Sequence, residues 1–277
     1  MRTMFKIHIF VFFALLGCSS GQPDKGRASS ALQDSSPRVY DVRPISPVDM
    51  FLMSPKFSSD GKAILATGEK FKGLFLLTMD GRVSRIAGDD ISGWQARFEG
   101  DRIVAFDNSR DPVVLSPPQY KVARGAPLVS EYPKVFQKDD AIILDDGAKE
   151  IVISPGNDKF YLPVLSPRKD AVVFEGLNTG IYIYDIGSKK TLHIGRGNHP
   201  SWLPDGSGIL YDISEDDGVK IISSDIYLAL RDGKKFKLTD TRDLKEMMPV
   251  ASPDMGLVAF ESDGQIFIGH LEIFGAR

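Results

Sequence analysis

The sequence predicts an all-β fold, a six-bladed β-propeller of four-stranded antiparallel blades. Three observations support this prediction. One short motif recurs six times in residues 37–277, further apolar segments follow most of its copies, and the copies are evenly spaced. They start at residues 55, 96, 133, 163, 200 and 249. The spacings of 41, 37, 30, 37 and 49 residues are close to the roughly 40 residues of one propeller blade.

Each copy of the motif predicts a strand, a tight turn and a second strand. Five copies align without a gap, at residues 55–66, 133–144, 163–174, 200–211 and 249–260, and a weaker sixth spans 96–106. In the copy that begins at Pro200, Pro204-Asp205-Gly206 favours a chain reversal, and β-branched and aromatic residues follow it. The aromatic residues at one equivalent position, Trp202, Phe57 and Phe98, are expected to pack between blades.

Two further strands complete the predicted unit. Apolar segments follow the motif at residues 74–78, 181–185, 226–230 and 266–270. Asp80-Gly81 and Asp232-Gly233 then provide hairpin turns to an outer strand. After residues 266–270 little chain is left, so residues 38–44 are expected to supply the last outer strand, with continuation of the chain through Phe274 as the alternative. A ring of blades leaves few sheet edges unpaired, whereas a β-sandwich is the competing fold.

The repeats resemble the WD-like (PD40-type) propeller repeats of the TolB family. The resemblance is carried by Trp202-Leu-Pro-Asp-Gly206, Ala251-Ser-Pro-Asp254 and Phe57-Ser-Ser-Asp-Gly61, and it covers essentially all of residues 37–277. It implies a propeller and suggests a role in organising the cell envelope. TolB-family proteins also carry an N-terminal α/β domain, in whose place this chain has a different N-terminal segment, so a direct Tol-Pal role does not follow.

The N-terminal segment predicts a bacterial lipoprotein. Arg2 and Lys6 precede an apolar run that is too short to span a bilayer, as in an export signal over residues 1–17. Leu15-Leu-Gly-Cys18 resembles the lipobox, which implies lipid attachment at Cys18, the single cysteine of the chain. Residues 18–36 are polar and small, and they predict a flexible tether. The expected location is the cell envelope, with Ser19 compatible with an outer membrane and a domain that faces the periplasm.

Composition narrows the expected partners. Without Arg2 and Lys6 the chain has 32 basic and 37 acidic residues, a net charge of −5, which does not favour nucleic acid. No spacing of His or Cys predicts a metal site, and no cofactor is predicted. The expected partners are the membrane, through the Cys18 lipid, and another envelope protein.

Candidate binding residues occupy one equivalent position, directly before the first residue of each copy, which is proline in five copies and Ala96 in the weaker sixth. The residues at this position are Ser54, Gln95, Tyr132, Leu162, His199 and Met248. In a propeller they would form a ring near one end of the central channel. We therefore predict that Ser54, Gln95, Tyr132, His199 and Met248 contact a partner or ligand. His193 and His270 are assigned to packing or to the surface.

The acidic segment 212–218 does not match a calcium-binding loop. In an EF-hand, glycine stands at the sixth position and glutamate at the twelfth, whereas here glycine is seventh and Ser223 is twelfth. We predict a solvated loop between strands for this segment.

The main functional prediction is a non-enzymatic module for protein-protein interaction, with no catalytic residue. The alternative is an enzyme that acts on polysaccharide, a lyase or a hydrolase, with His199, Tyr132 and Glu131 at the channel mouth. Binding of calcium or a small ligand in the channel is a further possibility.

Overall fold

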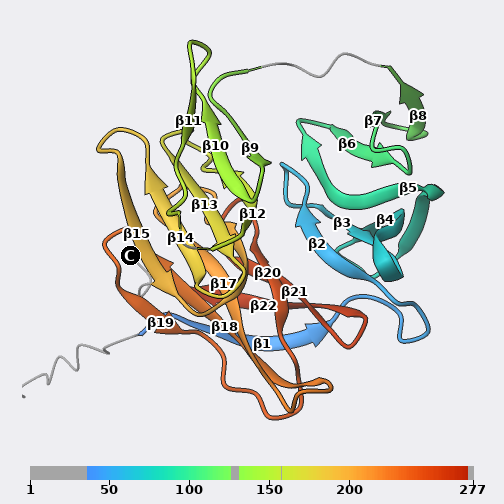
Figure 1. Cartoon of the computed structure of the whole chain (residues 1–277). Coiled ribbons are helices and arrows are strands. Elements are labelled where there is room, and N and C mark those ends of the chain that lie inside the picture. The colour runs from blue at the N-terminus through green and yellow to red at the C-terminus, as the bar shows by residue number, and fades with distance from the viewer. Residues whose placement is uncertain (1–35, 126–130, 157, 274–277) are drawn as a thin grey trace, which may run out of the picture. The chain divides into compact units, whose positions relative to one another are not determined.

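The computed structural model describes residues 36–125, 131–156 and 158–273, and these are built almost entirely of β-strands (Figure 1). Within these ranges there are 22 strands in five sheets, one 3-10 helix at Glu69–Phe71, and no α-helix. None of the described helical structure is long and apolar enough to cross a membrane. The all-β prediction is confirmed. Cys18, the predicted signal peptide and all but the last residue of the predicted tether lie outside the described residues.

Two sheets match the predicted unit, with four strands in chain order. The β12–β15 sheet consists of Phe160–Leu165 (β12), Ala171–Gly176 (β13), Gly180–Asp185 (β14) and Lys190–Gly195 (β15). The β16–β19 sheet consists of Asn198–Trp202 (β16), Gly208–Asp216 (β17), Ile221–Leu230 (β18) and Lys235–Lys237 (β19). Between β16 and β17, Gly206 has a φ of +69° and the Asp205 carboxylate accepts the Ser207 N–H at 2.9 Å. The Pro-Asp-Gly motif therefore forms the turn that its residue types favour.

The third four-stranded sheet joins the two ends of residues 37–277. Its strand order is β1-β22-β21-β20, from Arg38–Pro44 (β1), Gln265–Glu272 (β22), Leu257–Ser262 (β21) and Met247–Ala251 (β20). β1 pairs antiparallel with β22, from Arg38 opposite Glu272 to Pro44 opposite Phe267 (Figure 1). Val39 and Val42 pack against the same buried cluster as Leu271, which fixes the register of β1. The prediction that residues 38–44 supply this outer strand is confirmed.

The seven-stranded sheet corrects the prediction of separate four-stranded blades. Its strands are Met53–Phe57 (β2), Ala63–Thr67 (β3), Lys72–Thr78 (β4), Val83–Glu99 (β5), Arg102–Asp107 (β6), Pro112–Ser116 (β7) and Lys121–Arg124 (β8). The 17-residue β5 pairs with β4 through its first half and with β6 through its second half. Two copies of the repeat are therefore joined in one sheet, because the chain stays extended where one outer strand and the next inner strand were expected to separate.

The three-stranded sheet is a second correction to the predicted unit. It contains Lys134–Lys138 (β9), Ala141–Asp145 (β10) and Glu150–Val152 (β11), in the order β11-β10-β9. Only 30 residues separate Pro133 from Pro163, the first residues of two successive copies. The chain therefore passes from β11 to β12 without a fourth strand.

The hydrophobic core is divided into clusters, four of which join strands of neighbouring sheets and one of which fills the seven-stranded sheet. Trp202 belongs to the cluster between β12–β15 and β16–β19, and its indole N–H donates to the Val164 carbonyl at 3.0 Å. Phe57 lies in the cluster that β2–β4 share with β21 and β22. For Trp202 and Phe57 the predicted packing between units is confirmed.

The first strand of each repeat meets the neighbouring unit and carries an irregularity at the candidate ring position. β12 contacts β9, β16 contacts β13, β20 contacts β16 and β17, and β2 contacts β20 and β21. The residue directly before the start of the copy has positive φ in five copies, four of which start with proline and one with Ala96: Ser54 (54°), Gln95 (60°), Leu162 (51°), His199 (49°) and Met248 (55°). A positive φ is uncommon outside glycine, and the strand pairing shifts register at the same places. The bulge turns these residues out of the regular alternation and places them where two units meet.

Candidate functional site

A histidine–aspartate pair lies where β16, β17 and β20 meet. His199 Nδ1 is 2.8 Å from Asp212 Oδ1, and the backbone N–H of Met248 donates to the same oxygen at 3.0 Å. Asp212 is fully buried, whereas 34% of the His199 side chain is exposed. Because an ionised carboxylate can only accept, the hydrogen on the neutral imidazole lies on Nδ1, and Nε2 is the basic nitrogen.

Glu175 joins this pair from the neighbouring sheet. Its Oε1 accepts the backbone N–H of His199 at 3.1 Å, and the Tyr161 hydroxyl donates to the same carboxyl group. Glu261, on β21, lies close enough for the charges of His199 and Asp212 to act on it, and it accepts the Gly264 N–H at 2.6 Å. We call His199, Asp212, Glu175, Glu261 and Lys56 the acid–base cluster.

The three acids occupy one equivalent position, which sequence reasoning missed. Glu175, Asp212 and Glu261 each stand twelve residues after the proline of their own copy and follow its second apolar strand. All three are buried. A buried position that repeatedly carries a carboxyl group is unusual, because burial disfavours the charged form, and this repetition is the signal that could have revealed them.

Burial raises the pKa values of two of these acids, Glu175 and Glu261. It raises the pKa of Glu175 to about 7, and the charge of Asp212 adds to this effect, while His199 and the hydrogen bonds from His199 and Tyr161 oppose it. Burial likewise raises the pKa of Glu261, against the hydrogen bond from Gly264. Near neutral pH, Glu175 is therefore able to hold or release a proton.

The pKa values of the two basic members of the cluster, His199 and Lys56, shift for different reasons. Burial acts to lower the pKa of His199, but the hydrogen bond and charge of Asp212, together with the charge of Glu175, outweigh it and raise the pKa. Burial lowers the pKa of Lys56, on β2, to about 8, and its charge acts on His199. The cluster therefore contains a base, an acid and a cation whose pKa values are shifted by burial and by one another's charges, as is typical of catalytic groups.

Of the predicted ring residues, the structure brings together His199 and Met248. Tyr132 is about half exposed, and Lys134 Nζ lies 4.6 Å from the centre of its ring, while Glu131 forms an ion pair with Lys169. Gln95 is exposed and Ser54 is half-buried at the start of its own sheet. A binding role for these residues stays a prediction. The interpretation of residues 212–218 as a solvated loop is wrong for residues 212–216, which lie in β17, and Asp212 is fully buried there.

In the part of the chain that the structure describes, no group of three or more His, Cys, Asp or Glu side chains is arranged to hold a metal ion.

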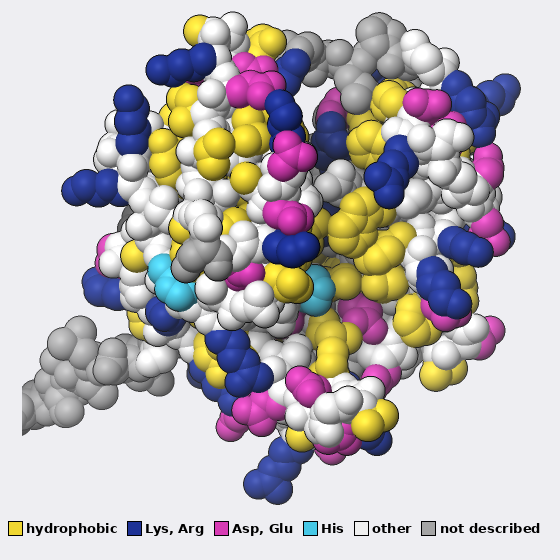
Figure 2. All heavy atoms as spheres, viewed as in Figure 1, with side chains coloured by type: hydrophobic (Ala, Val, Ile, Leu, Met, Phe, Trp, Pro, Cys, Tyr) yellow, Lys and Arg dark blue, Asp and Glu magenta, His cyan; other side chains and the backbone are white. Residues whose placement is uncertain are grey.

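On the face drawn in Figure 2, hydrophobic side chains gather through the middle of the view, and charged side chains surround them.

Comparison with known proteins identifies the type of fold. No protein family model matches the chain, and no curated protein matches it. A gluconolactonase from Xanthomonas campestris is similar in structure, with a TM-score of 0.59 and 10% identity over 87% of this chain and 96% of that chain. An oligogalacturonate lyase from Vibrio parahaemolyticus has a TM-score of 0.50 and 14% identity over 85% of this chain and 97% of that chain. The fold is of propeller type.

A protein described as TolB from Agrobacterium tumefaciens is also similar, with a TM-score of 0.38 and 18% identity over 82% of this chain and 79% of that chain. A likeness of this size carries no argument. The gluconolactonase and the oligogalacturonate lyase are less than 25% identical to this chain, so their likeness shows the fold alone.

The prediction that the protein is not an enzyme is contradicted. The gluconolactonase and the oligogalacturonate lyase are both enzymes, so solved structures of this fold type include catalysts. The prediction had rested on the lack of a convincing acid–base pair in the sequence. The structure assembles such groups from strands that are distant along the chain.

Proposed function

We propose that the protein is a carbohydrate-active enzyme, a polysaccharide lyase that uses the acid–base cluster to eliminate a sugar from an acidic polysaccharide. The observation that carries this proposal is the His199–Asp212 pair, with its 2.8 Å contact to a fully buried carboxylate. A buried carboxylate on Nδ1 orients the imidazole, fixes its tautomer and stabilises the imidazolium that forms when Nε2 takes a proton.

The reaction needs a base, an acid and a cation. His199 Nε2 removes the proton from the carbon next to the substrate carboxylate, and the C–H electrons form a carbon–carbon double bond. The bond from the neighbouring carbon to the leaving sugar oxygen breaks, and that oxygen takes a proton from the partly exposed Tyr161 hydroxyl. The buried Glu175, whose pKa of about 7 keeps it partly protonated, returns a proton to Tyr161 through the hydrogen bond between them. Lys56 stabilises the negative charge that develops on the substrate carboxylate.

The same cluster is less suited to a glycosidase that relies on two carboxyl groups. Such an enzyme needs one carboxylate free to attack the sugar or to activate water. Asp212 is fully buried and accepts hydrogen bonds from His199 and Met248, so it has no access to a substrate. Hydrolysis remains the second candidate, because the His199–Asp212 pair is equally able to take a proton from water.

The same proposal includes the architecture and the cellular setting. Six copies of the repeat, two of them joined through β5, would make a six-bladed ring, and the pairing of β1 with β22 supports this arrangement. A lipid on Cys18 would hold the enzyme in the cell envelope, where acidic polysaccharides or another envelope protein are accessible.

The test is an assay of the full chain on polygalacturonate and on a neutral polysaccharide. A lyase creates an unsaturated uronate, which absorbs in the ultraviolet, whereas a hydrolase releases reducing ends without this absorbance. We expect unsaturated product from the acidic polymer and its loss in His199→Gln, with full activity in the matched control His270→Gln, whose side chain is 52% exposed. New reducing ends without absorbance would establish the hydrolase instead. No product from a panel of acidic and neutral polysaccharides would overturn the proposal.

A further inference from the structure

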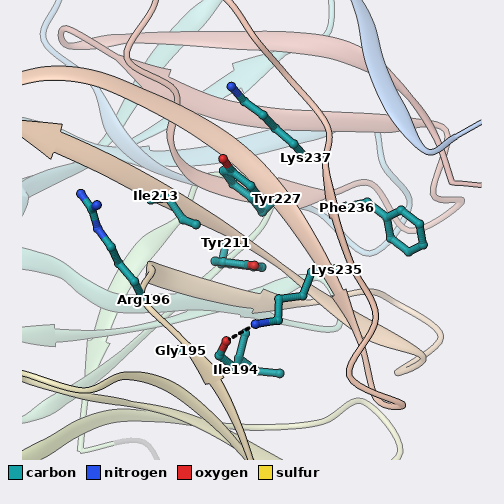
Figure 3. A pocket seen from close by; sticks show the side chains of 9 residues that line it. All are labelled: Ile194, Gly195, Arg196, Tyr211, Ile213, Tyr227, Lys235, Phe236 and Lys237. Carbon is teal, nitrogen blue, oxygen red and sulfur yellow. Dashed lines mark hydrogen bonds between the residues drawn. The ribbon is translucent and has the colours of Figure 1, made fainter.

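A cavity lies between the end of β15 and strands β17 to β19, and Figure 3 shows the side chains that line it. Its volume is about 310 Å³, which is at the lower end of the size of small-molecule sites. Tyr211 and Tyr227 contribute aromatic rings whose centres are 5.7 Å apart. Ile194 and Ile213 add apolar surface.

The backbone beside the cavity is shaped around Tyr211. Gly197 follows β15 with a φ of +155°, and a Cβ at this position would come within 2.5 Å of Tyr211 Cδ2. Any other residue would therefore collide with the ring. Burial raises the pKa of Tyr211 to about 12, with the nearby Tyr227 adding to the effect, so Tyr211 remains a neutral hydrogen-bonding group.

The charged side chains around the cavity are all cations. Arg196, Lys235 and Lys237 line it, and none of its lining residues is Asp or Glu. Lys237 is neutralised by Asp225 and Asp240. Arg196 donates instead to the Ser214 carbonyl, and Lys235 Nζ donates to the Ile194 carbonyl at 2.6 Å (Figure 3). Among the described residues, neither Arg196 nor Lys235 forms an ion pair with a carboxylate, so two positive charges flank an aromatic cavity without a counter-charge.

This cavity is separate from the acid–base cluster. Tyr211 and Asp212 are consecutive in β17, and consecutive side chains of a strand point to opposite faces. Tyr211 packs with the cluster shared by β12–β15 and β16–β19, while Asp212 accepts a hydrogen bond from Met248 in the sheet on the other side. A ligand in the cavity would therefore not occupy the proposed catalytic position.

We propose that this cavity binds a small organic anion, a single carboxylate attached to a ring of sugar or benzene size. The guanidinium of Arg196 and the ammonium of Lys235 bind the carboxylate, because ionised donors and acceptors form the stronger hydrogen bonds. The face of the ring lies on Tyr227 and Ile213, which are both partly exposed, whereas the buried Tyr211 packs against the Tyr227 ring. The inference does not depend on the proposed catalytic activity.

The test is isothermal titration of the full chain with D-galacturonate and with benzoate, and with galactose as the neutral probe. We expect one of the two anions to bind, with affinity that falls as salt is added, and galactose not to bind. Arg196→Gln and Lys235→Gln should each weaken binding by about tenfold, because each removes one charged contact. The matched control Lys62→Gln, an exposed lysine on another sheet, should leave it unchanged. The anion that binds identifies the ring.

Three results would overturn the proposal. The first is no binding of either anion to a folded protein, with folding checked by circular dichroism. The second is binding that Arg196→Gln and Lys235→Gln leave unchanged. The third is galacturonate binding that disappears only in His199→Gln, because the ligand would then lie in the acid–base cluster.

Discussion

The two parts of the molecule on either side of residue 157 are built from the same repeat, but they differ in what the repeat carries at one position. The second strand of three units, β13, β17 or β21, contains a buried acid twelve residues after the first proline: Glu175, Asp212 or Glu261. In β3 and β10 the equivalent residues are Thr67 and Asp145, and Asp145 is only partly buried. The repeated backbone sets where a side chain points, whereas the residue type at one position decides which units carry a buried acid.

The largest expected effect is a difference in turnover between variants of two equivalently placed aspartates, Asp212 and Asp145. Asp212→Asn should reduce turnover about 10³- to 10⁴-fold, because an amide at this position no longer fixes the tautomer of His199. Asp145→Asn, at the equivalent position, should leave turnover within about twofold, since no member of the cluster contacts Asp145. The measurement is kcat on the polysaccharide that the wild-type protein cleaves. Equal losses in both variants would show that the position serves folding in every unit.

The next largest expected effect is a difference in the free energy of unfolding between a variant in the β12–β15 sheet and a variant in the three-stranded sheet. Phe174 is fully buried, and its ring lies 5.7 Å from Phe160 and 5.6 Å from Tyr182. Phe174→Ala should lower the free energy of unfolding by about 3–5 kcal/mol, the usual cost of a large cavity. Val152→Ala, at a residue that is 63% exposed, should change it by less than about 0.5 kcal/mol. Urea denaturation measures both, and similar values for the two variants would contradict the assignment of the core.

The raised pKa of Glu175 predicts that the free energy of unfolding depends on pH. Its pKa is raised by burial from 4.5 to about 7 in the folded protein, so the folded state binds a proton more tightly than the unfolded state. Its contribution to stability is therefore fully present below pH 4.5 and is lost as the pH rises to about 7, a change of about 3 kcal/mol. Glu175→Gln should flatten the fall in unfolding free energy between these pH values. An unchanged pH profile would mean that Glu175 ionises normally.

The smallest effect concerns the junction of the two ends. Arg38 and Glu272 form an ion pair at 2.8 Å, but 62% of the Arg38 side chain is exposed. A double-mutant cycle with Arg38→Ala and Glu272→Ala should give a coupling of less than about 1 kcal/mol, because solvent screens the pair. A larger coupling would show that the ion pair, rather than Val39 and Val42, holds β1 on β22.

The sequence was a good guide to local structure and to one long-range pairing. The Pro-Asp-Gly turns, the alternation of strands and the return of residues 38–44 to β22 followed from local chemistry and from counting strands. The 17-residue β5 could not be predicted, because nothing in residues 83–99 distinguishes one continuous strand from two that separate. The missing fourth strand after β11 could have been inferred from the 30-residue spacing alone.

The candidate site was predicted only in part. His199 was found because it occupies a ring position, but its partners were not. Asp212 was assigned to a solvated loop, and Glu175, Glu261 and Lys56 were not considered. These groups come from four different sheets, so only the packing of one sheet on the next brings them together. The recurrence of an acid twelve residues after Pro163, Pro200 and Pro249 was the available signal.

The measurement that tests the central claim most directly is an NMR titration of His199 in the wild-type protein and in Asp212→Asn. The account predicts a neutral imidazole with its hydrogen on Nδ1, a pKa above the ordinary value of 6.5, and a clear fall of that pKa in the variant. A neutral form protonated on Nε2, or a His199 pKa that is the same in both proteins, would contradict the assignment of His199 and Asp212 as the acid–base pair.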